Sequence, residues 1–148
     1  MIMCASLIDK ATNLAGLSRT CEIMNCQSLL VDNKDIIKAK EFKDIEIHHE
    51  DWLPIYEVKI VHLLDYLKYQ KQNGYSLLGL EQTANSKMIN DYKFPDKCIL
   101  LLGKEKEGIP QEYLGLLDAC IEIPQFGIVR SLNVHVSGAI CMWEYNNK

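Results

Sequence analysis

Short apolar runs alternate along this chain with segments whose apolar residues recur at helical spacing, and this alternation constrains the fold more than any other feature. The apolar runs, which we interpret as buried strands, are 2–7, 27–31, 75–80, 98–102 and 119–123. The helical segments are 14–24, 35–42, 61–72, 110–117 and 132–145. Because strands that alternate with helices form parallel sheets, the pattern predicts an α/β fold: a largely parallel sheet flanked by helices.

Two stretches are less regular. Pro54 forbids a continuous central strand in segment 45–58, whose structure the pattern leaves open. Segment 81–92 is expected to be a polar connection.

Helix ends carry their own signals. Thr12 or Asn13 is the expected cap of the first helix. Gly74 indicates the end of the helix before it, and Pro110 is expected to open a short helix.

The length of the chain fits one core, so we expect residues 1–148 to form a single domain. Because the chain begins directly in an apolar run, we expect this domain to be a piece of a longer protein or else a very compact one. No stretch approaches the roughly 18 apolar residues that span a bilayer. The first residues lack the basic and long apolar regions of a signal peptide, so no membrane partner is expected.

The chain has six cysteines, none in a CxxC pair, and most lie inside apolar runs. This is typical of buried, reduced thiols and predicts an intracellular protein, cytoplasmic or nuclear, that is not secreted. Segment His48–Asp51 contains two histidines and two acids, but as neighbours rather than at ligand spacing. No metal is therefore expected.

The formal net charge is −4 and the isoelectric point is near 5.5. This balance argues against strong nucleic-acid binding by the domain alone, because a basic footprint is typical of such binding.

Three segments combine polar residues with glycine. In Asn13–Thr20, Arg19 follows the small pair Ala15 and Gly16, which lets a backbone or ligand approach closely. The alternative is a solvated helix arginine beside a tight helix–sheet contact.

In the second segment, Leu100–Pro110, an apolar strand ends at Gly103 and a charged loop follows to Gly108. Glycine at a strand end frees backbone groups to meet a flat ligand. A charged surface turn is the alternative.

In the third segment, Ile121–Val134, a strand meets Pro124 and Gly127 before Ser131 opens an apolar helix. Ser131 is expected to be at least its N-cap. Asn133 has poor helix propensity at its position, and as a buried polar residue there it is expected to have a hydrogen-bond partner or a functional role.

The three segments together resemble, in order and spacing, the three signature motifs of the SpoU/TrmH branch of the SPOUT methyltransferases. The resemblance covers nearly the whole chain. A closer similarity is to the C-terminal catalytic domain of the eukaryotic TAR-RNA-binding-protein type tRNA methyltransferases. The segments that carry it are Ala5–Lys10, Gly79–Ala84 and Arg130–Gly138.

The resemblance implies S-adenosylmethionine-dependent methylation of a ribose 2′-hydroxyl in RNA, with a guanosine in the D-loop of tRNA as the target and S-adenosylhomocysteine as the product. It also implies a deep trefoil knot in the C-terminal half and a homodimer with sites at the subunit interface. Two alternatives remain: an inactive RNA- or protein-binding module of the same fold, and a ribosomal RNA 2′-O-methyltransferase.

Residue roles follow from the same resemblance. Arg19 takes the hydroxyl proton or clamps the substrate phosphate, and Glu105 orients the catalytic groups. Ser131 and Asn133 fix Arg19 or the ribose, and Asn13 shapes the entry to the first helix. The residues expected around the cofactor are Leu80, Thr83, Leu102, Gly103, Ile123 and Leu132.

Three positions depart from the family pattern. Ala15 replaces a glycine, Lys104 replaces an asparagine before Glu105, and Ala11 stands where close relatives have proline.

Overall fold

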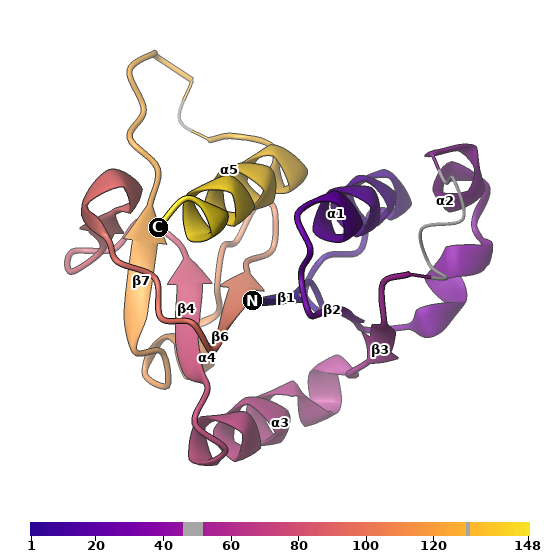
Figure 1. Cartoon of the computed structure of the whole chain (residues 1–148), viewed down its shortest axis with the longest axis horizontal. Helices are drawn as coiled ribbons and strands as arrows, with labels where there is room; N and C mark the ends of the chain where they lie inside the picture. Colours follow the sequence, from indigo (N-terminus) through magenta and orange to yellow (C-terminus); the bar gives the residue numbers. More distant parts are fainter. Residues whose placement is uncertain (46–51, 130) are drawn as a thin grey trace.

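The structure is a computed structural model that describes residues 1–45, 52–129 and 131–148. Within these ranges seven strands form one sheet in the order β3-β2-β1-β6-β4-β7-β5, and each pairing is parallel (Figure 1). The strands are β1 (Ile2–Cys4), β2 (Ser28–Val31), β3 (Ile55–Glu57), β4 (Ser76–Leu80), β5 (Lys87–Met88), β6 (Cys98–Leu102) and β7 (Ala119–Glu122). The predicted α/β class with a parallel sheet is confirmed.

Helices cover both faces of the sheet. Those of the described residues are α1 (Ala11–Ile23), α2 (Lys40–Ile45), α3 (Ile60–Gln72), α4 (Gln111–Leu114) and α5 (Val134–Asn146), with 3₁₀ turns at Lys34–Lys38 and Ile89–Asp91. Figure 1 shows α1 and α5 side by side on one face and α3 on the other. The arrangement brings the first and last helices of the chain together.

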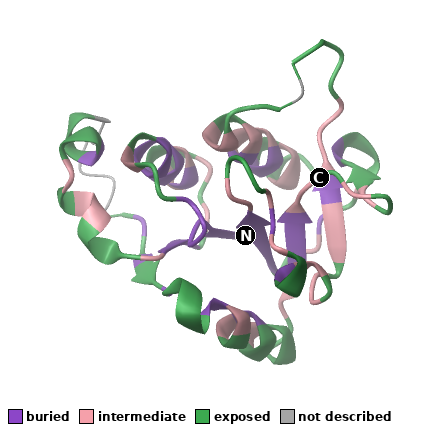
Figure 2. Cartoon of the chain, turned by 180° about the vertical axis from the view of Figure 1, so that it is seen from behind, coloured by how far each residue is buried: buried purple, intermediate pink, exposed green. Residues whose placement is uncertain are grey.

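Successive side chains of β6 point to opposite faces of the sheet, and this explains why the protein has one core on each face. Leu100 and Leu102 point into the core under α1 and α5, whereas Ile99 and Leu101 point into the core under α3. All four are at most 1% exposed. Figure 2 shows buried residues concentrated in the central strands. A strand buried on both faces must be apolar throughout, which is why the run 98–102 predicted its bounds correctly.

The edges of the sheet differ from the expectation. Segment 81–92 contains β5 and a 3₁₀ turn, so its interpretation as a plain polar connection is wrong. Lys87 and Met88 pair with β7 through their backbones, while both side chains stay exposed, so this two-residue strand forms no apolar run. In the segment left open, β3 follows Pro54 directly and forms the opposite edge, where a proline is tolerated.

The N-caps of α1 and α5 also differ from the sequence-based expectation. Neither Thr12 nor Asn13 caps α1: the helix begins at Ala11, its N-cap is Lys10, and no described side chain caps it. Asn133, not Ser131, caps α5, because its Oδ1 accepts hydrogen bonds from His135 N (2.8 Å) and Val136 N (3.2 Å). Asn133 is exposed rather than buried. An Asn at the N-cap has the short acceptor that the free N–H groups need.

Other predicted ends are confirmed in part. Gly74 follows α3 with a φ of 90°, the left-handed conformation that glycine adopts readily. Pro110 is the N-cap of α4, which ends at Leu114, earlier than expected. Residues 35–42 divide between a 3₁₀ turn and the start of α2.

All six cysteines are free thiols. Burial raises the pKa of Cys4 to about 11 and that of Cys141 to about 12, so both thiols stay protonated near neutral pH. No described helix has the length and hydropathy needed to cross a membrane.

Candidate functional site

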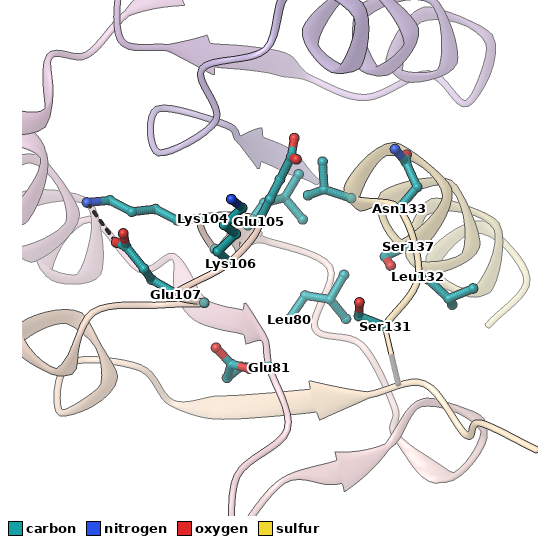
Figure 3. Close-up of a pocket in the computed structure, with 14 residues that line it drawn as sticks. Leu80, Glu81, Lys104, Glu105, Lys106, Glu107, Ser131, Leu132, Asn133 and Ser137 are labelled. Atoms are coloured by element: carbon teal, nitrogen blue, oxygen red, sulfur yellow. Dashed lines mark ion pairs between the residues drawn. The ribbon is translucent and has the colours of Figure 1, made fainter. Parts of the chain in front are cut away.

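A cavity of about 560 Å³ opens where the carboxyl ends of β4 and β6 meet the N-terminus of α5 (Figure 3). Its walls come from residues 80–81, 102–108, 131–134 and 137. The carboxyl ends of parallel strands are where ligands bind in α/β sheets. The loops after β4 and β6 and the segment before α5, which the sequence analysis singled out, therefore form one cavity.

The loop after β6 is a tight, charged hairpin. Lys104 and Gly108 exchange two backbone hydrogen bonds of 2.8 and 2.9 Å. A Cβ at Gly103 would lie 2.6 Å from the carbonyl carbon of Gly108, and Gly108 has a φ of +70°. Only glycine fits both positions. The glycine pair therefore closes the hairpin and holds its charged tip, 105–107, at the rim of the cavity.

Glu81, which directly follows β4, anchors this hairpin. Its Oε2 accepts a 2.8 Å hydrogen bond from the N–H of Ile109, and the carboxylate packs against Gly108. Ile109 is 4% exposed, so its N–H is shielded from water. The carboxylate thus satisfies a buried donor and fixes where the hairpin lies.

Hydrogen bonds connect the three polar segments at the mouth of the cavity. The amide nitrogen of Asn133 donates to Asn13 Oδ1 over 3.0 Å, and the amide nitrogen of Asn13 donates to Glu105 Oε1. Lys10 pairs with the other oxygen of Glu105 at 2.9 Å, and this carboxylate raises the pKa of the Lys10 ammonium. Residues far apart in the sequence therefore hold the Glu105 carboxylate in one orientation.

The α1–α5 contact depends on a glycine and a histidine. The imidazole of His135 packs against Gly16 so closely that a Cβ there would collide with the ring, and Thr20 Oγ1 shares a 2.8 Å hydrogen bond with His135 Nε2. Burial lowers the pKa of His135. The close approach expected at the small pair is thus to α5 of the same chain.

Arg19 lies exposed on α1, and it is not among the described residues that line the cavity. Ala15, by contrast, is fully buried. The structure therefore brings Asn13, Glu105 and Asn133 together and leaves Arg19 outside their hydrogen-bonded group.

The residues expected around a cofactor divide between three places. Leu80, Leu102, Gly103 and Leu132 line the large cavity, together with Ser131. Ile123 lines an adjoining cavity of about 160 Å³ that shares Leu80, Ser131 and Leu132 with the first.

Thr83 lies apart, in a turn where the Ser86 hydroxyl donates a 2.8 Å hydrogen bond to its carbonyl. It lines a separate cavity beside Cys120.

Sequence reasoning missed Glu81, Lys10, His135 and Ser137 as parts of this region. A signal for Glu81 was available, since it is an acid directly after a buried strand. No local pattern singles out His135, because its contacts with Gly16 and Thr20 form only when α1 and α5 pack together.

The described residues contain no group of three His, Cys, Asp or Glu side chains that could hold a metal. Segment His48–Asp51 lies outside the described residues, as does Arg130.

Comparison with known families and proteins shows what this chain is similar to. A family model described as the SpoU rRNA Methylase family matches residues 1–143. The tRNA (guanosine(18)-2′-O)-methyltransferase TARBP1 of Mus musculus is 49% identical over 148 residues, which are 100% of this chain and 9% of that protein. The tRNA (guanosine(18)-2′-O)-methyltransferase of Saccharomyces cerevisiae is 38% identical over 98% of this chain and 10% of that protein. The chain thus spans about a tenth of the length of these two relatives.

Solved structures share the fold. The A. aeolicus TrmH/SpoU tRNA modifying enzyme matches with a TM-score of 0.83 at 22% identity, over 99% of this chain and 73% of that one. The SpoU methyltransferase AviRb from Streptomyces viridochromogenes, in complex with AdoMet, matches with a TM-score of 0.77 at 18% identity, over 99% and 56% of the two chains.

Proposed function

This chain belongs to the SpoU rRNA Methylase family, and from that membership we propose that it methylates a ribose 2′-hydroxyl of a guanosine in tRNA, with S-adenosylmethionine as the methyl donor. The observation that carries the proposal is the hydrogen-bonded group of Asn13, Glu105 and Asn133 at the mouth of the large cavity. The tRNA substrate and the guanosine are supported by the names of the mouse and yeast relatives, which specify guanosine(18) of tRNA. The place of this guanosine in the D-loop stays a prediction from the family resemblance.

The lining of the large cavity supports this choice of cofactor. Leu80, Leu102 and Leu132 give it apolar walls, and the glycine pair Gly103 and Gly108 closes the hairpin beside them. The sulfonium cofactor supplies an electrophilic methyl group. Within the chain, these residues would hold the adenine and exclude water from it.

The ribose hydroxyl would meet the polar group at the rim. Glu105 is held by Asn13 and Lys10, so its carboxylate orients neighbouring donors rather than moving freely. Ser131 and Asn133, which line the same cavity, would position the ribose. Arg19 would bind the adjacent phosphate as a guanidinium or take the hydroxyl proton.

We further propose a homodimer, in which a second copy completes the site near Arg19. Exposed apolar side chains on α5 and on the segment that leads to it support this proposal: Ile128 is 97% exposed, Phe126 is 96% exposed and Trp143 is 57% exposed. The deep trefoil knot is proposed on the likeness to TrmH/SpoU structures. A crystal structure with a continuous trace from β7 to α5 would test both.

A cytoplasmic or nuclear location is proposed on the buried, protonated thiols of Cys4 and Cys141. That residues 1–148 are a single domain of a longer protein stays a prediction.

The decisive experiment incubates the protein with labelled S-adenosylmethionine and separated tRNA and ribosomal RNA, then maps the modified nucleotide. Label at the 2′-oxygen of a tRNA guanosine supports the proposal. Label in ribosomal RNA alone would favour the ribosomal alternative, and cofactor binding without transfer to any RNA would favour the inactive module.

A further inference from the structure

Another cavity, here named the second cavity, has a volume of about 470 Å³. It lies on the far side of the hairpin tip from the large cavity, in which the cofactor is proposed to bind. Residues 104–107 line both cavities, so a single loop separates them. Lys10 and Glu105, which form the ion pair described above, also line this second cavity. A molecule bound here would reach the polar group of Asn13 and Glu105 from the side opposite the cofactor.

The floor of this second cavity is apolar. Leu7 and Ile8 lie in the segment between β1 and α1 and are 5% and 4% exposed, and Ile60 at the start of α3 is 43% exposed. These three aliphatic residues line one cavity and give it apolar surface against which a planar ring can pack. Nucleobases taken out of a helix are held in pockets with such apolar surfaces.

The rim of the second cavity carries both basic and acidic side chains. Lys10, Lys104 and Lys106 place ammonium groups where an RNA backbone would approach, which complements phosphates. Glu107 is paired with Lys104 at 3.5 Å. Asp9, next to Ile8 on the floor, is an exposed carboxylate that can accept hydrogen bonds from the N1–H and 2-amino groups of a guanine.

We propose that this cavity binds the guanine base of the nucleotide whose ribose is methylated, with Ile8 and Ile60 against the ring and Asp9 on its Watson–Crick edge. The inference rests on the proposed function, because it assigns the base of that same substrate. With the base here and the cofactor on the other side of the hairpin, the ribose lies between them, beside Glu105.

A matched pair of variants tests the floor. Ile60→Trp fills the cavity, whereas the neighbouring Val61→Trp does not, since Val61 is 78% exposed and is not among the described residues that line it. We expect Ile60→Trp to lower kcat/KM for tRNA by at least about tenfold with unchanged affinity for S-adenosylhomocysteine. Val61→Trp should stay near wild type. Equal activity of the two variants would overturn the inference.

The rim is tested with a tRNA that carries inosine at the target position, because inosine lacks only the 2-amino group of guanosine. Wild type should prefer guanosine by about tenfold or more, and Asp9→Ala, which removes the acceptor oxygens, should remove most of that preference. Preference retained in Asp9→Ala would contradict the assignment of Asp9 to the Watson–Crick edge.

Ultraviolet cross-linking of tRNA to the protein separates the two proposals. If wild type methylated no RNA, the proposed function would be wrong. Cross-links at residues 7–10 and 60 would then still support a base in the cavity, and cross-links only elsewhere would rule it out.

Discussion

The side chain of Asn133 donates a 3.0 Å hydrogen bond to Asn13 Oδ1 while its own oxygen caps α5, so one residue both starts the last helix and ties it to the first. Through Asn13 this connection continues to Glu105. The two roles of Asn133 use different atoms, which allows them to be separated by substitution.

Asn133→Asp keeps the capping oxygen but loses the amide donor to Asn13. We expect its stability in urea unfolding to stay close to wild type while methyl transfer falls. Asn133→Ala loses both roles and should also cost about 1 kcal/mol of unfolding free energy. If Asn133→Asp transferred methyl groups at the wild-type rate, the Asn133–Asn13 link would have no part in the reaction.

Glu81→Ala removes the acceptor for the buried N–H of Ile109 and frees the hairpin at Gly108. We expect a loss of about 1–3 kcal/mol in stability and a clear fall in S-adenosylhomocysteine affinity, measured by calorimetry. Glu81→Gln keeps an acceptor oxygen and should restore much of the affinity. Glu112→Ala, an exposed acid on α4, is the control and should change neither quantity.

Gly16→Ala places a methyl group against the imidazole of His135. Overpacking of this kind costs about 1–3 kcal/mol. Gly115→Ala is the matched control, because a Cβ there meets nothing within 4 Å and its backbone is already helical. The double variant Gly16→Ala/His135→Ala should have a higher unfolding free energy than Gly16→Ala alone, because the ring that the new methyl group meets is gone. If the unfolding free energy did not rise, the cost of Gly16→Ala would not come from a collision with His135.

Burial lowers the pKa of His135 below its ordinary value of 6.5. As pH falls through that value, the unfolded chain takes up a proton that the folded chain does not, so the unfolding free energy should decrease until the folded pKa is passed. Unfolding curves at several pH values would show a smaller decrease in His135→Gln.

Arg19→Ala should abolish methyl transfer, because Arg19 is proposed to bind the substrate phosphate or take the hydroxyl proton. The variant should still bind the cofactor, because Arg19 is not among the described residues that line the large cavity. Lys38→Ala removes an exposed cation elsewhere and serves as the control. Arg19→Lys tells whether charge alone suffices, since lysine lacks the planar fork that binds phosphate. Normal transfer by Arg19→Ala would remove Arg19 from the mechanism.

Several elements could be predicted because their cause is local. The run 98–102 is apolar at every position, so it is recognisable as a strand covered on both faces. Gly74 marks a helix end because its backbone needs a positive φ. In β5 the two side chains are exposed and only backbone pairing defines the strand, so composition contains no trace of it.

The sequence by itself determined the α/β class, the central strands and the three polar segments, because burial and backbone conformation depend on residue type within a short window. Only the tertiary structure decided what the polar side chains do. Asn13, expected to cap a helix, instead bonds Glu105, and Asn133 caps the helix that Ser131 was expected to open. Hydrogen bonds between residues 92 and 120 positions apart exist only once the sheet has brought α1, α5 and the hairpin together, and no local pattern encodes that distance.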